Sequence, residues 1–203
     1  MKTIYSLLAV ILLSSFNLAD EVVKVGDVAP DFTLKNIDGN MVSLSDFGEN
    51  KGVILIFSCN TCPFVVKYED RMIELDNAFR EMGYPVVAIN PNDVSIKPGD
   101  SYEEMVKRAD ALDFPFDYLY DETQEIAEAY GATRTPQVYL LKNMDGEFQV
   151  AYIGAIDNSV ESADAVTEAY VENAIESLEN GDVPNPDFTK AIGCTIKWKP
   201  AEN

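Results

Sequence analysis

The stretch Val53–Met72, VILIFSCNTCPFVVKYEDRM, joins an apolar run to two cysteines that are separated by two residues. The run Val53–Phe57 is rich in β-branched residues and apolar on both faces, which is typical of a central strand buried under helices on both sides. From about Cys62 to Met82, apolar side chains recur at helical spacing between charges, and Gly83 follows as a helix stop. The stretch therefore predicts a strand, a Cys-x-x-Cys turn and a helix in succession.

The flanking sequence predicts strands and helices in an order that defines an α/β fold. The predicted elements are a hairpin over Phe32–Leu44, strands at Tyr84–Asn90, Phe114–Asp121, Thr135–Lys142 and Phe148–Gly154, a turn-rich loop over residues 91–100, and helices at Ser101–Leu112, Thr123–Tyr130 and Ala163–Leu178. Strands joined by helical crossovers should be parallel, and the last two strands should form an antiparallel hairpin. We expect a three-layer α/β/α sandwich with a central mixed sheet and an N-terminal β-hairpin extension.

The first 19 residues have the features of a secretory signal peptide. Lys2 supplies a positive charge, Ile4–Leu13 is a short apolar segment, and Ala19 offers a cleavage site. We expect a periplasmic or secreted protein, and membrane association only if this signal stays uncleaved as an anchor. Residues 20–203 should form one domain, with an irregular, proline-containing tail from about residue 182.

Charge and composition limit the classes of partner and site. The chain has 203 residues and a formal net charge of -20, so it should repel nucleic-acid backbones. It contains no histidine, which excludes Cys-His and Ser-His-Asp catalysis and metal sites with imidazole ligands. Haem attachment needs a histidine directly after the second cysteine, where this chain has Pro63. One Cys-x-x-Cys and a distant Cys194 fall short of the four ligands of a zinc site. We expect no cofactor and no resident metal.

The position of Cys59 and Cys62 predicts redox chemistry. The dipole and free N–H groups of a helix N-terminus stabilise a thiolate, and a two-residue spacer lets the two sulfurs close a small disulfide ring. We expect Cys59 to be the exposed attacking thiol and Cys62 the more buried resolving thiol. Pro63 is tolerated because it falls in the first helical turn.

Two further positions are candidates for this site. Thr135-Pro136 begins a later strand, and a cis bond there would present the Thr135 backbone to a bound peptide. Pro136 is also a common structural choice at the start of a strand. Cys194 is a candidate third thiol that could resolve a mixed disulfide. It could equally be a buried cysteine that packs beside Ile196 and Trp198.

These motifs resemble the thioredoxin-like superfamily. VGDVAPDFTL at residues 25–34 resembles the amino-terminal signature of its redoxin branch, the alkyl hydroperoxide reductase/thiol-specific antioxidant (AhpC/TSA) family. IFSCNTCPF (56–64), TPQVYLL (135–141) and GCTIKWK (193–199) resemble a subset of exported thioredoxin-like proteins with a Cys-Asn-Thr-Cys-Pro motif. The resemblance covers about Val25 to Lys199. It implies that Cys59 is the nucleophile, Cys62 the resolving cysteine and Pro136 the cis-proline.

The chain also departs from these families at positions that matter for chemistry. Ser58 precedes the first cysteine, where thioredoxins usually have tryptophan, and Val53 stands where they carry a buried aspartate that assists proton transfer. Another acid, or water, would have to replace that aspartate. The peroxiredoxin pattern Pro-x-x-x-Thr-x-x-Cys does not precede Cys59, Cys62 or Cys194, which disfavours a conventional peroxidase site.

The sequence thus predicts an exported thiol-disulfide oxidoreductase that uses Cys59 and Cys62 on protein or small disulfide substrates, together with a redox partner protein. A thiol peroxidase in which a cysteine sulfenate is resolved by a second thiol is an alternative. A carrier that binds Cu(I) through the same two thiolates is a second alternative. A purely structural disulfide is a poor explanation, because so small a ring constrains little of the unfolded chain.

Overall fold

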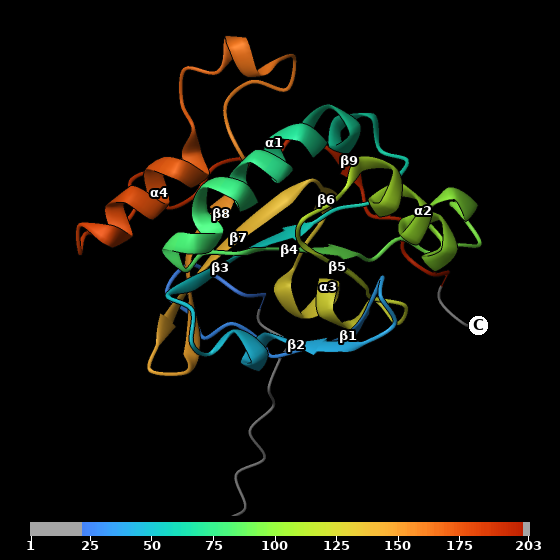
Figure 1. Cartoon of the computed structure of the whole chain (residues 1–203), viewed down its shortest axis with the longest axis horizontal. Helices are drawn as coiled ribbons and strands as arrows, with labels where there is room; N and C mark the ends of the chain where they lie inside the picture. The colour runs from blue at the N-terminus through green and yellow to red at the C-terminus, as the bar shows by residue number, and fades with distance from the viewer. Residues whose placement is uncertain (1–21, 201–203) are drawn as a thin grey trace, which may run out of the picture.

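A computed structural model describes residues 22–200, which are organised around a seven-stranded mixed sheet (Figure 1). The strand order is β2-β1-β5-β4-β3-β7-β8. The strands are β1 (Thr33–Asn36), β2 (Met41–Ser43), β3 (Gly52–Phe57), β4 (Val86–Asn90), β5 (Asp117–Tyr120), β7 (Gln137–Met144) and β8 (Glu147–Gly154). The predicted signal peptide over residues 1–19 lies outside the described residues.

Strand directions follow the prediction. β3 runs parallel to β4, and β4 runs parallel to β5, because helical crossovers join these strands. β7 is antiparallel to both β3 and β8, so the predicted late hairpin is confirmed. The N-terminal hairpin β1–β2 is also confirmed and extends the sheet beyond β5.

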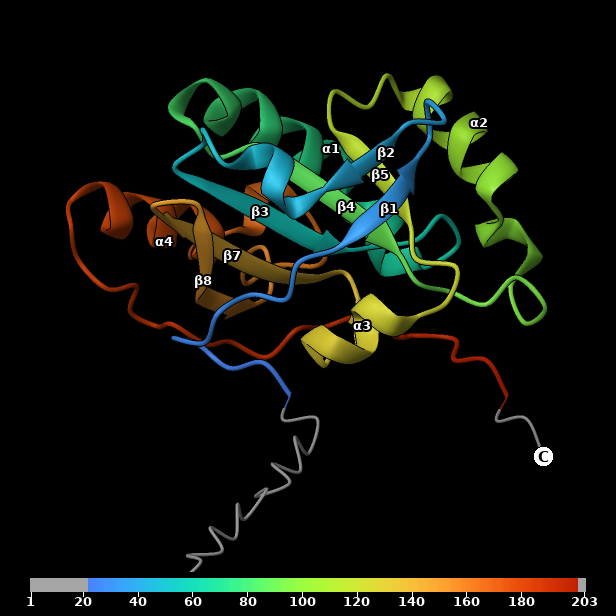
Figure 2. The ribbon, with the colours of Figure 1, turned by 90° about the horizontal axis from the view of Figure 1, so that it is seen from below.

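Helices cover both faces of the sheet, which confirms the three-layer sandwich (Figures 1 and 2). The helices are α1 (Pro63–Phe79), α2 (Tyr102–Leu112), α3 (Glu125–Tyr130) and α4 (Tyr170–Glu179), with short 3-10 turns η1 (Leu44–Phe47), η2 (Arg80–Met82), η3 (Pro98–Asp100) and η4 (Ala163–Ala165). α1, α2 and α4 pack on one face, and α3 packs on the other. None of the helices in residues 22–200 is long and apolar enough to cross a membrane.

β3 is buried along its whole length, which explains its apolar sequence. Ile54 and Ile56 face the core under α1 and α4, whereas Leu55 and Phe57 face the core above α3. The strand is thus held from both sides and presents its carboxyl end, and the cysteines that follow, at one edge of the sheet.

The prediction of one long helix over Ala163–Leu178 is wrong in its first part. Residues 155–169 form a loop with only the short turn η4, and α4 begins at Tyr170. The side chain of Asn158 accepts hydrogen bonds from the backbone N–H groups of Thr167 and Glu168 at 3.0 and 3.2 Å. These bonds satisfy backbone N–H groups of the loop without a helix. The spacing of Ala163 and Val166 therefore resembles that of a helix although this segment is not helical.

The C-terminal tail is irregular over most of its length but makes two short strand pairings. It passes β8, where Phe188 pairs with Ile153, and then reaches the far end of the molecule (Figure 2). There the short strand β9 (Cys194–Thr195) pairs antiparallel with β6 (Arg134–Thr135). This two-stranded sheet places a residue of the tail directly opposite Thr135.

Candidate redox-active site

Cys59 and Cys62 lie where the chain leaves β3 and enters α1. Cys62 is the N-cap of α1, with extended backbone angles, and Pro63 is the first helical residue as predicted. Cys59 is 2 % exposed and Cys62 is 3 % exposed. The expectation that Cys59 is the more exposed thiol is therefore wrong, because α1 begins only at Pro63, four residues after Cys59, and the loop between them packs Cys59 inward.

Thr135 faces both sulfurs and is itself fully buried. Its hydroxyl oxygen lies 3.3 Å from Cys59 Sγ, and its carbonyl oxygen lies 3.2 Å from Cys62 Sγ, which donates to it when protonated. The Thr135–Pro136 bond is cis, as predicted. The structure thus brings together four of the predicted site residues, Cys59, Cys62, Thr135 and Pro136.

A buried carboxylate anchors the Cys-x-x-Cys loop from the other side. Asp100 Oδ1 accepts the backbone N–H groups of Asn60 and Thr61, each at 2.9 Å. Its Oδ2 accepts from Thr61 Oγ1 at 3.0 Å and from Asn92 Nδ2 at 2.8 Å. Two consecutive amides on one carboxylate oxygen hold the backbone between the cysteines in a single conformation.

Sequence reasoning missed Asp100, Asn92 and Tyr118. The Tyr118 hydroxyl donates to Asn60 Oδ1 at 3.0 Å, and its ring is buried beside the dithiol. No pattern marks these residues, since Asp100 and Asn92 lie in a turn-rich loop and Tyr118 in an ordinary strand. Val53 is buried and apolar, so it has no group that could take part in proton transfer. Asp100 is the acidic side chain whose charge acts on Cys59.

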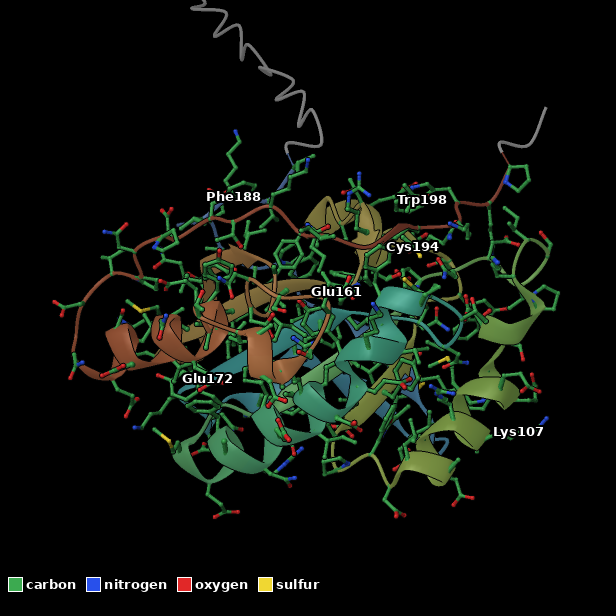
Figure 3. All side chains as sticks on the ribbon, turned by 90° about the horizontal axis from the view of Figure 1, so that it is seen from above. Lys107, Glu161, Glu172, Phe188, Cys194 and Trp198 are labelled. Carbon is green, nitrogen blue, oxygen red and sulfur yellow. The ribbon has the colours of Figure 1, made fainter. Side chains whose placement is uncertain are left out.

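Cys194 packs against Cys59, Cys62 and Val65. Figure 3 shows it on the tail where the tail crosses the start of α1. Its thiol forms a hydrogen bond with Cys62 Sγ. Ile196 and Trp198, by contrast, pack in the core beneath the sheet. Of the two predicted environments for Cys194, the structure shows the one beside the dithiol.

Hydrogen bonds and charge shift the pKa values of the two buried thiols in opposite directions. The Cys59 thiol, the Cys194 thiol and the backbone N–H groups of Val65 and Cys194 all point to Cys62 Sγ. Led by the bond from Cys59 and opposed by burial, these contacts lower the pKa of Cys62 to about 4. The bond to Cys62, burial and the negative charge of Asp100 raise the pKa of Cys59 well above the usual range.

The pair therefore shares one proton, and the sulfur with more donors carries the negative charge. A thiolate at Cys62 accepts four hydrogen bonds, one of them from the backbone N–H of Val65 at the N-terminus of α1 and one from the backbone N–H of Cys194 in β9. A thiolate at Cys59 would accept from the Thr135 hydroxyl and would face Asp100. The geometry thus favours the thiolate on Cys62. Burial and the bond to Cys62 raise the pKa of Cys194 to about 11.

The nearby cations are engaged elsewhere. Arg134 Nη1 donates to the Gly193 carbonyl at 2.9 Å and so holds the tail. Lys67 pairs with Glu161 at 3.1 Å on the surface. The thiolate is consequently stabilised by hydrogen bonds and the helix terminus, without a direct ion pair to either residue.

The comparisons with known proteins agree with this geometry. The AhpC/TSA family model matches residues 25–158. The thiol-disulfide oxidoreductase ResA of Oceanobacillus iheyensis is 32% identical over 150 residues, which cover 69% of this chain and 71% of that protein. The crystal structure of a conserved protein from Geobacillus kaustophilus is 39% identical, covers 88% of this chain and 94% of that one, and has a TM-score of 0.82.

The fold also matches that of a thioredoxin domain. The thioredoxin domain of a thiol-disulfide oxidoreductase from Bacteroides vulgatus is 23% identical, covers 63% of this chain and 87% of that one, and superposes with a TM-score of 0.53. The architecture of residues 22–200 is thus thioredoxin-like. With its Cys-x-x-Cys at the end of a central strand and its match over most of the folded region, the chain belongs to the AhpC/TSA family.

Proposed function

We propose that this member of the AhpC/TSA family works as an exported thiol-disulfide oxidoreductase through Cys59 and Cys62. The observation that carries the proposal is the pair of sulfurs between β3 and α1, in which the hydrogen bond from Cys59 lowers the pKa of Cys62. Family membership and the similarity to the ResA protein support the same enzyme class, an oxidoreductase that acts on thiols and disulfides. Residues 1–19 support export to the periplasm or the medium.

In this proposal the two cysteines have roles opposite to those that the sequence predicts, which the hydrogen bonds to Cys62 support. In the reductive direction, the Cys62 thiolate attacks one sulfur of a substrate disulfide, and the other substrate sulfur leaves as a thiolate. Cys59 then gives up its proton and attacks Cys62 Sγ in the mixed disulfide. The second substrate thiol leaves, and a Cys59–Cys62 disulfide remains. Two electrons pass from the protein to the substrate.

A substrate needs access to Cys62, which is 3 % exposed. Thr135 would present its backbone to a peptide substrate, but in this structure the backbone of Cys194 occupies that edge. β9 has only two residues, so a substrate strand can replace it at the loss of few hydrogen bonds. Substrate binding and displacement of β9 would then be one event.

Reduction of insulin disulfides by the full chain, with dithiothreitol as the electron source, tests the proposal. In a Cys194→Ser background, Cys59→Ser and Cys62→Ser should each lower the rate by about 100-fold or more, whereas Ser177→Ala, a partly exposed position on α4, serves as the control. With Cys194→Ser present in both proteins, a mixed disulfide with substrate should accumulate in Cys59→Ser and should be absent in Cys62→Ser. The reverse result would restore Cys59 as the nucleophile.

Two other outcomes would replace the proposal. Rapid consumption of hydrogen peroxide without insulin reduction would identify a thiol peroxidase. Tight, stoichiometric binding of Cu(I) without either activity would identify a copper carrier. A partner protein that reduces or oxidises the dithiol is part of the proposed cycle, and the reduction potential of the Cys59–Cys62 couple would give the direction of electron flow.

A further inference from the structure

The C-terminal tail is fastened on both sides of Cys194. Before it, the Gly193 carbonyl accepts from Arg134, and a Cβ at Gly193 would lie 2.2 Å from the Thr135 carbonyl oxygen. After it, the Lys197 N–H donates to Asn92 Oδ1 at 2.9 Å, and the Lys197 carbonyl accepts from Gln124 Nε2 at 2.8 Å. The position of Cys194 is thus built into the fold.

Cys62 is the sulfur that the other two cysteines share. Cys59, Cys62 and Cys194 pack in one cluster, and the thiols of Cys59 and Cys194 both act on Cys62 Sγ, so Cys62 has a thiol beside it on either side. All three cysteines are free in this structure, which describes the fully reduced protein. In an oxidised protein, Cys62 can form a disulfide with one neighbour while the other remains a thiol.

The three sulfurs also differ in access to solvent. Cys59 and Cys62 are buried, whereas Cys194 is partly exposed at the surface of the tail (Figure 3). A disulfide between Cys59 and Cys62 is therefore shielded from an external thiol. A disulfide between Cys62 and Cys194 would have one sulfur that such a thiol can reach.

We propose that Cys194 is a third redox thiol, which takes over the disulfide from the buried pair and offers it to an external thiol reductant. Cys194 loses its proton and attacks Cys62 Sγ; the Cys59–Cys62 bond breaks, and its electron pair leaves on Cys59, which takes up a proton. A Cys62–Cys194 disulfide replaces the original one, so the number of disulfides and electrons in the protein is unchanged. This step rests on the proposed function, because that reaction supplies the Cys59–Cys62 disulfide.

The second half of the cycle uses the properties of Cys62. An external thiolate attacks the exposed Cys194 sulfur, and Cys62 leaves as the thiolate that its hydrogen bonds already stabilise. Exchange is faster when the leaving thiol has a low pKa. A second external thiol then releases Cys194 as a thiol, and the protein has gained two electrons. The reductant is a dithiol protein or a small thiol.

Peptide mapping of the oxidised full chain tests the disulfide transfer. Trypsin places Cys59 and Cys62 together in Gly52–Lys67 and places Cys194 in Ala191–Lys197. After oxidation with oxidised glutathione and alkylation of free thiols at low pH, the proposal expects these two peptides to be joined by a disulfide in part of the protein. Cys59→Ser should form the joined pair at least about tenfold faster than Cys62→Ser, because Cys62 is the sulfur beside Cys194.

The rate of reduction provides a second readout. Dithiothreitol should reduce oxidised Cys194→Ser about tenfold or more slowly than the oxidised wild type, since it must reach a buried disulfide. Absence of the joined peptides in both the wild type and Cys59→Ser would overturn the proposal. So would equal rates of reduction of the wild type and Cys194→Ser.

The two proposals fail separately. If insulin is reduced in a manner that depends on Cys59 and Cys62 but the joined peptides never form, only the role of Cys194 is wrong. If the joined peptides form but insulin is not reduced, the transfer is real and the proposed enzyme activity is wrong.

Discussion

Replacement of Asp100 gives a sharp test of how the dithiol loop is held. The carboxylate is fully buried and accepts four hydrogen bonds, from two backbone amides, the Thr61 hydroxyl and the Asn92 side chain. Asp100→Ala leaves these donors without an acceptor. Loss of one member of a buried charged network costs about 3–5 kcal/mol. Because water can reach Thr61 at the surface, we expect a loss of about 3 kcal/mol in the free energy of unfolding.

Asp100→Asn is the matched variant, since it keeps the shape and one acceptor oxygen. The oxygen can still accept both backbone amides of the loop, and the Thr61 hydroxyl can rotate to accept. Only the contact with Asn92 Nδ2, which now meets a second donor, is lost. One unpaired buried donor corresponds to about 1–2 kcal/mol. Urea unfolding of the reduced proteins should therefore separate the two variants clearly.

Both variants remove the negative charge that faces Cys59. Asp100 raises the pKa of Cys59, so either replacement should lower that pKa and speed the alkylation of Cys59 by iodoacetamide at neutral pH. The measurement belongs in a Cys62→Ser, Cys194→Ser background, where no neighbouring thiol shares the proton. Equal destabilisation by alanine and asparagine, or an unchanged alkylation rate in Asp100→Asn, would refute this account of Asp100.

Three further predictions follow from the same site. Because its pKa is lower in the folded protein, Cys62 stabilises the reduced fold above the ordinary thiol pKa of about 8.5, and this contribution is lost as the pH falls through about 4. The free energy of unfolding of the wild type should show this loss between pH 8 and pH 4, and Cys62→Ser should lack it. Gly193→Ala should cost about 1–3 kcal/mol and expose Cys194 to faster alkylation, because its Cβ would collide with a backbone oxygen of β6; Gly48→Ala, with helical backbone angles and one 3.3 Å contact, should change little. In a chain-entropy account, the Cys62–Cys194 disulfide of oxidised Cys59→Ser closes a ring of about 130 residues and should stabilise the fold by about 5 kcal/mol. The Cys59–Cys62 disulfide of oxidised Cys194→Ser closes a ring of four residues and should add about 2 kcal/mol. Equal gains in urea unfolding would contradict this.

The sequence predicts the part of the site that is local in the chain. The apolar run of β3, the cysteine spacing and Pro63 at the first helical position each carry a physical signal within a few residues. Together they place the dithiol between β3 and α1, as the structure shows. The sequence predicts a cis Thr135–Pro136 bond only because the Cys-x-x-Cys lies upstream of it, since a proline at the start of a strand is ambiguous by itself.

The parts that could not be predicted depend on contacts between distant segments. Asp100 lies about 40 residues after the loop that it anchors, and its burial follows from the packing of a turn that looks solvent-exposed in sequence. The thiolate is favoured at Cys62 because Cys194 arrives from the tail and Asp100 from the opposite side. Before the last helix, the spacing of Ala163 and Val166 matches a helical turn, but the Asn158 side chain accepts from the backbone N–H groups of Thr167 and Glu168 and a loop forms instead.

On the proposal for Cys194, the tail strand β9 controls access to the dithiol, and it lies in a different part of the chain from the dithiol. The family model ends at residue 158, so Cys59, Cys62 and Pro136 lie inside the matched region and Cys194 lies beyond it. Gly193 and Lys197 fasten the tail with contacts that leave the dithiol backbone untouched. Substitutions in the tail should therefore change which molecules reach the dithiol and, through Cys194, the pKa of Cys62, while β3 and α1 stay the same.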